Sequence, residues 1–254
     1  MGAGHVHALY VHEHSLVHKL APEVKLVAAF GFVLAVALTP REALWAFAAY
    51  GVLLVALLAG SRFRPGFVLA RMMAVLPFVL FAFLIPFIAS GERVELLGVA
   101  VSREGLWGMW NIVAKASLGI TVSILLAGTT EVADMLRGMG RLCVPALLTT
   151  IASFMVRYLE LISSELGRMR VAMTSRGYDP RWLWQARPLA ASAGALFIRS
   201  YERGERVHAA MLSRGYTGTM PDLGHRRATR REWLMAAALV LTAGAIAAAA
   251  LVTR

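Results

Sequence analysis

The residues with the clearest chemical potential are two arginines that occur in copies of one short phrase. Residues 172–178 read Ala-Met-Thr-Ser-Arg-Gly-Tyr and residues 210–216 read Ala-Met-Leu-Ser-Arg-Gly-Tyr, so six of seven positions agree at a separation of 38 residues. Glycine is the usual residue just past a helix end, because it adopts the left-handed conformation at no side-chain cost. The repeat therefore predicts two helices that carry Arg176 and Arg214 in their last turns.

A repeated helix-end arginine has two interpretations. A cation at this place complements the negative end of the helix dipole, which is worth less than ~1 kcal/mol when it is exposed. Dipole complementation needs neither the serine before the arginine nor the tyrosine two residues after it, yet both recur. A guanidinium fork also pairs bidentately with a carboxylate. The repeat thus favours two matching docking sites for acidic grooves on a partner, formed by Ser175, Arg176, Gly177, Ser213, Arg214 and Gly215.

Motifs for enzymatic chemistry are missing from the sequence. It contains no Gly-x-x-x-x-Gly-Lys-Ser/Thr phosphate loop, no Cys-x-x-Cys, no His-Glu-x-x-His and no Gly-x-Ser-x-Gly. A single cysteine excludes an intrachain disulfide. We therefore predict a protein without a catalytic site and without a cofactor.

Five histidines near the N-terminus leave two interpretations open. Their spacing is compatible with chelation of a divalent transition metal ion. The interpretation that we favour is a solvated, disordered or interfacial tail that binds no metal. The five candidates are His5, His7, His12, His14 and His18.

Composition predicts a membrane protein. Of the 254 residues 58% are hydrophobic, whereas a soluble domain is about 45–50% apolar. Apolar runs that approach the length of a transmembrane helix cover residues 20–38, 43–60, 67–89, 106–127 and 233–252. The first run reaches this length only if the Lys25 side chain snorkels, and Pro77 and Pro86 are expected to kink the third. The predicted fold is all-α, a polytopic membrane protein with about five transmembrane helices.

A long basic region separates the fourth and fifth runs. Residues 129–232 hold 16 Lys and Arg and nine acidic residues, within a chain of net charge +11. The apolar spacing from Val132 to Leu142 predicts a short amphipathic helix. Residues 146–156 are apolar but too short to span alone, so we expect them to lead straight into the helix of the first repeat.

Charge also predicts the orientation. Cytoplasmic loops carry the excess of Lys and Arg, and residues 61–66 and 129–232 are the basic segments here. The loops at 40–42 and 91–105 are neutral and slightly acidic. We expect a multi-pass protein of the cell membrane whose N-terminus and basic region are cytoplasmic. The predicted divisions are 1–128 with four spans, 129–232 with the repeats, and 233–254 with the last span.

The stretch from Thr129 to Gly218 resembles the transmembrane T component of energy-coupling factor (ECF) transporters. The resemblance is carried by Thr129-Thr130, Leu136 through Pro145, Arg157 through Leu159, Glu165, Arg168 through Arg170 and the two Arg-Gly motifs. Near the N-terminus, Ser15, His18, Leu20, Pro22, Lys25 and Leu26 are similar to the start of the cobalt-type CbiQ subfamily. Ser175 and Ser213 depart from the alanine of the general family, and Ala21 and Glu23 replace its common Asp and Arg.

The resemblance implies a scaffold with cytoplasmic amphipathic coupling helices. In this family each coupling-helix arginine docks in an acidic groove of one ATPase subunit. A separate, small substrate-binding membrane subunit, the S subunit, captures the solute. Carried over to this chain, the docking arginines are Arg176 and Arg214, and the partners are two ATPases and a cobalt-type S subunit in the lipid bilayer.

Other solutes and two other classes of function are also compatible with parts of the sequence. The solute is expected to be cobalt(II), with nickel or a vitamin as alternatives that use the same kind of component. A stand-alone channel or carrier is a second class, in which Lys115 and the kinked third span line a path. In the alternative interpretation Lys115 has a structural role, and its side chain snorkels to the headgroups or pairs within the bundle. A membrane anchor that binds anionic lipid or nucleic acid through residues 225–231 is a third, but no aromatic residues interleave that cluster, so we expect no nucleic-acid partner.

Overall fold

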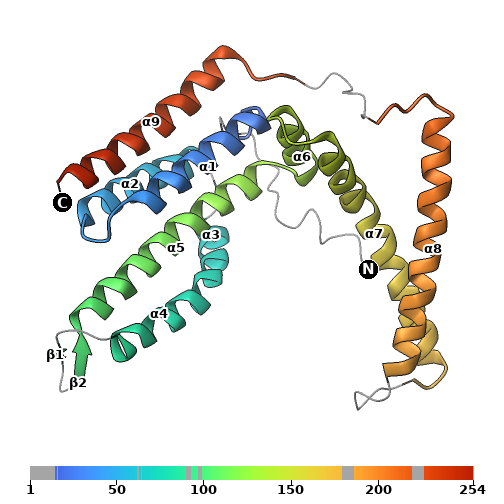
Figure 1. Ribbon diagram of the computed structural model, residues 1–254, viewed down its shortest axis with the longest axis horizontal. Helices are drawn as coiled ribbons and strands as arrows, with labels where there is room; N and C mark the ends of the chain where they lie inside the picture. Colours follow the sequence, from blue (N-terminus) through green and yellow to red (C-terminus); the bar gives the residue numbers. More distant parts are fainter. Residues whose placement is uncertain are drawn as a thin grey trace. The chain divides into compact units, whose positions relative to one another are not determined.

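The chain folds almost entirely into helices, seen in a computed structural model that describes residues 15, 17–61, 63, 65–89, 93–96, 99–178, 186–218 and 226–253. The elements in order are α1 (Pro22–Leu38), α2 (Leu44–Ser61), α3 (Pro65–Met72), the short 3-10 helix η1 (Met73–Val75), α4 (Leu76–Ile88), β1 (Arg93–Leu96), β2 (Val99–Ser102), α5 (Arg103–Thr129), α6 (Val132–Arg141), α7 (Ala146–Ser175), α8 (Arg187–Leu212) and α9 (Arg230–Val252) (Figure 1).

Membrane-spanning length and apolar composition occur five times in the described residues. The five candidate spans are Leu44–Ser61, Gly66–Ile88, Arg103–Thr129, Ala146–Ser175 and Arg230–Val252. The prediction of an all-α polytopic membrane protein is confirmed, although the set of spans differs from the predicted one. With 17 residues, α1 is about 26 Å long, shorter than the ~30 Å hydrocarbon core. Instead α7 qualifies, because residues 146–156 continue without a break into the helix of the first repeat.

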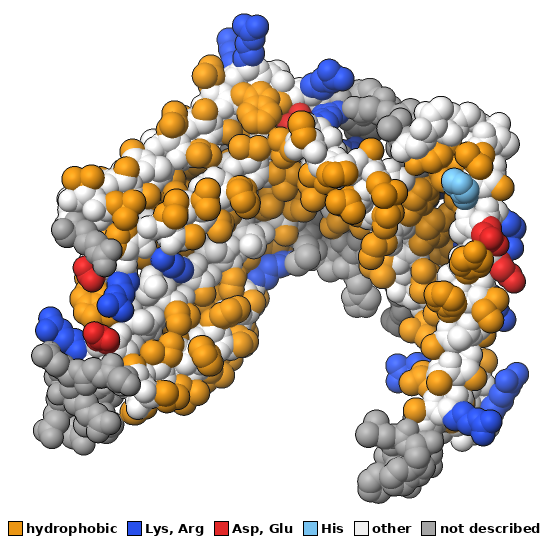
Figure 2. Space-filling model, in the orientation of Figure 1, with side chains coloured by type: hydrophobic (Ala, Val, Ile, Leu, Met, Phe, Trp, Pro, Cys, Tyr) orange, Lys and Arg blue, Asp and Glu red, His pale blue; other side chains and the backbone are white. Residues whose placement is uncertain are grey.

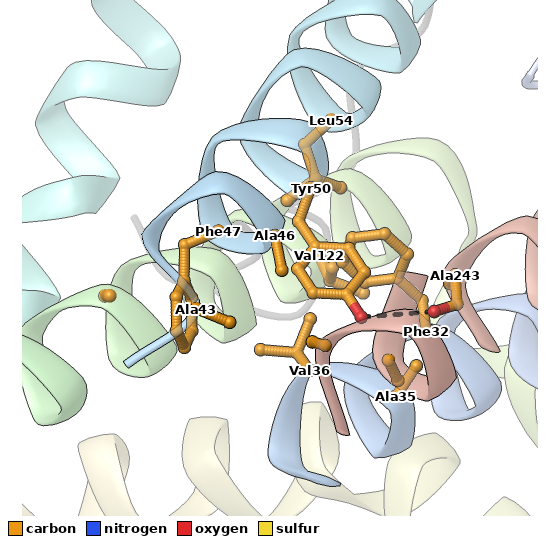
Figure 3. Packing of buried hydrophobic residues seen from close by; sticks show 13 residues of the cluster. Phe32, Ala35, Val36, Ala43, Ala46, Phe47, Tyr50, Leu54, Val122 and Ala243 are labelled. Carbon is orange, nitrogen blue, oxygen red and sulfur yellow. Dashed lines mark hydrogen bonds between the residues drawn. The ribbon is translucent and has the colours of Figure 1, made fainter. Parts of the chain in front are cut away.

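Four helices, α1, α2, α5 and α9, form a bundle whose core lies around Tyr50. The side chain of Tyr50 is fully buried and its ring meets Phe32 edge-on at 5.4 Å. The Tyr50 hydroxyl donates to the carbonyl of Ala243 at 3.1 Å (Figure 3). It also lies 3.0 Å from Thr39 Oγ1. A buried hydroxyl without a partner is costly, so these bonds pin α2 to both α1 and α9.

Helices α1 and α9 run parallel and approach closely. Near their N-terminal ends the Glu23 carboxylate accepts from the N–H of Ala228 at 3.0 Å. Further along, a Cβ added to Gly31 lies 2.7 Å from a Val240 methyl carbon. Small residues at such crossings let two helices pack backbone to backbone in a membrane.

Several connections meet at the end of the bundle where α1 begins. Lys25 on α1 bonds to the end of α5 at Thr129, and His18 meets Phe63, just after α2, edge-on at 5.8 Å. At the same end, Glu23 in the first turn of α1 bonds to Ala228, which lies just before α9. Residues near 20, 63, 129 and 228 therefore lie at one end of the bundle.

The third apolar run is broken into α3, η1 and α4. Pro77 lies in the first turn of α4, and the 3-10 turn begins at Met73, four residues earlier. A proline lacks the N–H for the i−4 bond and its ring crowds that carbonyl, which explains the break. The expected kink is found at this point, whereas Pro86 lies inside the continuous helix α4.

The connection after α4 differs from the polar loop that the sequence predicted. It contains an antiparallel hairpin in which Arg93 pairs with Ser102 and Leu96 with Val99. Residues 93–96 alternate charged and branched apolar side chains, which is the period of a strand, whereas residues 99–102 are apolar up to Ser102. Backbone pairing of these eight residues is the physical reason for the difference.

The chain divides into two compact units within α6. One unit contains residues 9–138 and 226–254, and the other contains residues 139–225. The first holds the helix bundle, and the second holds the end of α6 and all of α7 and α8. The repeats therefore belong to a unit of their own, and residues 226–232 belong to the bundle.

Replacing Gly31 by alanine is expected to destabilise the bundle by about 1–3 kcal/mol, because the stiff Val240 side chain must move. The matched control is Gly51→Ala in α2, where an added Cβ meets nothing within 4 Å. That substitution is expected to be neutral or to stabilise by up to ~1 kcal/mol through helix propensity. Thermal unfolding of the detergent-solubilised protein measures both, and equal effects would contradict the close packing of α1 and α9.

Candidate functional site

Helix α7 ends in a hydrogen-bonded glycine turn. The carbonyl oxygen of Met173 accepts from the N–H groups of Arg176 and Tyr178, each at 3.1 Å. Gly177 lies between them with a φ of 78°, a conformation that a side chain would oppose. The bond from the Tyr178 N–H to the Met173 carbonyl spans five residues and is the 6→1 bond of a Schellman motif.

Helix α8 repeats this geometry bond for bond. The Met211 carbonyl accepts from the N–H groups of Arg214 and Tyr216, each at 3.0 Å. Gly215 has a φ of 83°. The prediction that glycine terminates each repeat helix is confirmed.

The arginines themselves lie slightly beyond the predicted positions. The last helical residues are Ser175 in α7 and Leu212 in α8, so Arg176 and Arg214 stand in the turns that follow. The N–H of the glycine in each turn bonds three residues back, and this tightening ends the regular helix before the arginine. Each side chain is consequently presented beyond the helix end.

The side chains of the two motifs share one pattern of exposure. Both arginines are exposed, and both tyrosines are half-buried. The Ser175 hydroxyl donates to the carbonyl of Val171 at 2.9 Å, and the Ser213 hydroxyl donates to that of Ala210 at 3.0 Å. Because each serine hydroxyl is engaged by its own helix, the exposed guanidinium is the group left for a partner. Serine in place of alanine therefore leaves that group accessible.

Helices α7 and α8 form an antiparallel pair, so the two motifs lie at opposite ends of it (Figure 1). Near the end of α7, the Met173 sulfur accepts from Ser192 Oγ at 3.4 Å, close to the start of α8. From Ser192 to Arg214 the chain rises by about 33 Å at 1.5 Å per residue. The sequence had predicted two similar sites without indicating that they are separated in this way.

The crossing of α7 and α8 is held by ion pairs of Glu165. Its carboxylate accepts from Arg199 at 3.1 Å and lies 3.6 Å from Arg203, while the Glu165 side chain is only 11% exposed. Glu165 and Arg203 are themselves 38 residues apart, the spacing of the repeat. Equivalent positions of the two copies thus meet at the crossing, which is what a local two-fold axis requires. Arg176 and Arg214 each follow their member of this pair by 11 residues.

Lys25 is a buried anchor rather than a snorkelling residue, which corrects the prediction. The residue is 8% exposed. Its ammonium donates to His18 O at 3.2 Å, Thr129 O at 2.8 Å and Thr130 Oγ1 at 3.2 Å. Three acceptors match its three protons. The bonds fix the junction of α5 and α6, from which the chain leads into α7. Sequence reasoning noticed Lys25, Thr129 and Thr130 separately but had no signal that they meet.

Lys115 donates to the carbonyl of Ala37 at 2.9 Å, in the last turn of α1. A cation at this place satisfies a terminal carbonyl and complements the helix dipole. Of the two interpretations offered for Lys115, pairing within the bundle is the one that the contact supports.

Of the five candidate metal ligands only His18 lies among the described residues; His5, His7, His12 and His14 lie outside them. His18 Nδ1 is 2.7 Å from Ser15 Oγ. In the described part of the chain no three His, Cys, Asp or Glu side chains are grouped to hold a metal ion. Metal binding by the N-terminal histidines stays a prediction.

The fold and these helix ends define a class of protein. It is a polytopic membrane protein in which a separate helical unit carries two equivalent arginine-ended helices. A family model described as "Cobalt transport protein", CbiQ, matches residues 13–224. The chain therefore belongs to the CbiQ family.

Curated relatives agree with this family. An "Energy-coupling factor transporter transmembrane protein EcfT" of Bacillus selenitireducens is 29% identical over 95% of this chain and 93% of its own length. The protein of the same name from Bacillus subtilis is 26% identical, over 82% and 83%. "Cobalt transport protein CbiQ" of Rhodobacter capsulatus is 30% identical, over 56% of this chain and 60% of its own. The chain is a transmembrane, or T, component of the ECF type.

The substitution Glu165→Gln is expected to loosen the crossing of α7 and α8, because it removes the charge that holds two arginines. Spin labels on cysteines replacing Ser175 and Ser213 report the separation, in a chain whose native Cys143 is replaced by Asn. Asparagine suits that position, where φ is 66°. We expect one narrow distance distribution before the change and a broad one after it. Glu160→Gln, at an exposed position of the same helix, is the control, and equal broadening by both would contradict a specific brace.

The substitution Lys25→Met is expected to destabilise the bundle by about 1–3 kcal/mol, since it leaves the buried acceptors at Thr129 and Thr130 without their donor. Lys19→Met, an exposed lysine six residues earlier, should change stability by less than about 0.5 kcal/mol. Chemical unfolding in detergent micelles measures both. Loss of stability of the same size in the two variants would disprove the anchor.

Proposed function

We propose that this T component couples ATP hydrolysis in two partner ATPase subunits to reorientation of a separate S subunit, in an importer of cobalt(II). Arg176 and Arg214 are the docking residues, each in an acidic groove of one ATPase. The observation that carries the proposal is the pair of identical arginine-ended turns at opposite ends of one antiparallel helix pair.

The symmetry of the pair supports two equivalent partners. Residues related by the repeat meet at the Glu165–Arg203 contact, and each arginine lies 11 residues beyond it. Two similar grooves related by a two-fold axis would receive these ends in equivalent ways. An arginine–carboxylate fork is directional, so movement of either groove would be transmitted along its helix to the crossing.

Exposed apolar residues on α7 and α8 support contact with a further hydrophobic partner. Leu147, Met155, Val171 and Phe197 are each 66–73% exposed. Exposed apolar patches of this kind mark interfaces with proteins or membranes. The S subunit, itself a membrane protein, has the chemistry to cover them.

The orientation proposed from charge has the N-terminus, the 61–66 loop and the repeats in the cytoplasm. Its support is the shared end of the bundle at which the chain near residues 20, 63, 129 and 228 comes together. The division into 1–128, 129–232 and 233–254 is kept as the topological description that goes with this orientation.

Cobalt is favoured over nickel or a vitamin by the family description and by the Rhodobacter relative. The EcfT relatives carry no solute in their names. A stand-alone channel is disfavoured, because the ammonium of Lys115 is engaged by Ala37 within the bundle.

Arg176→Ala and Arg214→Ala are each expected to lower ATP-driven uptake at least tenfold, with membrane insertion retained, because each removes one rigid link to a motor subunit. Arg176→Lys should restore little, since an ammonium lacks the bidentate fork. Arg206→Ala is the control, an exposed arginine of α8 whose ion pair is with Glu202 in the same helix. Radioactive cobalt uptake into cells that express the whole complex is the measurement.

Purification from detergent extracts tests the assembly separately from the docking role and the solute. Recovery of two ATPases and a small membrane subunit with the unmodified chain supports the assembly, and full uptake by the Arg176→Ala, Arg214→Ala double variant would refute the docking role. Uptake of nickel or a vitamin in place of cobalt would refute only the proposed solute and leave the coupling role in place.

A further inference from the structure

An apolar groove lies in the bundle beside α9. Its volume is about 520 Å³, within the ~300–1,000 Å³ typical of ligand sites. Helices α1, α2, α5 and α9 all contribute to the lining, for example Ala28, Leu57, Leu125, Met235 and Leu239. The groove is open on one side, where Met235 is 53% exposed.

The few polar groups of the lining are already engaged by the protein. Lys25 has three acceptors for its three protons. Thr129 Oγ1 donates to the carbonyl of Leu125 at 2.7 Å, and Thr242 Oγ1 donates to that of Leu239 at 2.9 Å. The groove therefore offers an occupant hydrocarbon contacts and no hydrogen-bonding group, which suits an acyl chain better than a polar solute.

One end of the groove is marked by basic side chains. Met235, Ala238 and Thr242 line it, and Arg231 is the preceding member of the same i, i+4, i+7, i+11 stripe of α9. Lys19 precedes Leu20 of the lining, and its carbonyl accepts from the Arg226 guanidinium at 3.3 Å, which brings the two basic segments together. Figure 2 shows Lys and Arg side chains at the N-terminal end of α9 and hydrophobic side chains along the rest of it.

The charge at this end is not balanced by the nearby acids. Glu23 and Glu232 are each 4% exposed and bonded within the protein, Glu23 to Ala228 N and Glu232 to Thr229 and Arg226. Lys19 and Arg231 are exposed, and in the described part of the chain neither side chain forms an ion pair. A negatively charged group at the mouth of the groove would meet two available cations.

The dimensions fit one leaflet of a bilayer. From Arg231 to Thr242 the helix rises about 17 Å, roughly half of the ~30 Å hydrocarbon core. We propose that the groove binds an anionic phospholipid, with one acyl chain along α9 and its phosphate held by Arg231 and Lys19. Long basic side chains at a helix end reach headgroups in this way, and the proposal does not depend on the docking role of the repeats.

The test uses the full chain, solubilised from vesicles with equal amounts of phosphatidylglycerol and phosphatidylcholine, and native mass spectrometry to count retained lipids. We expect phosphatidylglycerol to be retained in excess. Arg231→Gln and Lys19→Gln should each lower the excess about fivefold, as expected for one cation near an anionic headgroup. Arg41→Gln is the control, an exposed arginine beyond the other end of α1. Equal retention of both lipids, or equal effects of Arg231→Gln and Arg41→Gln, would overturn the proposal.

A second pair of variants tests the acyl-chain part of the site. Ala238→Trp places a large ring in the groove, and Ala237→Trp places the same ring at the next residue, which is exposed and does not line it. We expect only the first to abolish retention, with unchanged elution on gel filtration. A diazirine side chain at position 238 should yield an adduct of lipid mass. An adduct with a peptide of another chain would identify a protein occupant and overturn the lipid site.

Discussion

The Glu165 carboxylate is the interaction on which the arrangement of the repeats depends. It is nearly buried and holds Arg199 and Arg203 of the facing helix. An isolated charge in this position would be unfavourable, so the carboxylate requires the arginines and fixes where α7 and α8 cross. Because Arg203 is the repeat equivalent of Glu165, the crossing sets Arg176 and Arg214 at the same distance along their helices. One ion-pair cluster thus gives the pair its symmetry.

The helix bundle follows a different constraint, the cost of unsatisfied polar groups in hydrocarbon. Tyr50, Lys25 and Lys115 are polar residues of apolar helices, and each donates to a carbonyl of a neighbouring element. These bonds join α2 to α9, α1 to α5 and α5 to α1. These polar groups are thus satisfied within the bundle, and the groove beside α9 is left with hydrocarbon walls.

Much of this organisation was predictable because it is local or compositional. Apolar runs longer than about 17 residues have few folded alternatives to a membrane helix. A glycine after Ser-Arg ends a helix through its own conformational freedom, so both helix ends followed from residues 172–178 and 210–216. The hairpin at 93–102 escaped prediction because four-residue strands give only a weak period-two signal. The continuation of α7 beyond residue 156 was predicted because residues 146–156 are apolar but too short to span a membrane alone.

By itself the sequence determined the class of protein, the two arginine motifs and their likeness, since each depends on residues that are neighbours in the chain. Only the tertiary structure decided that the motifs stand at opposite ends of an antiparallel pair and that Lys25 is an internal anchor. Those features join residues 38 to 105 positions apart, and no local pattern specifies which distant partner a charged side chain will meet. The packing of whole helices makes that choice, because buried charges are tolerated only where partners from several elements converge.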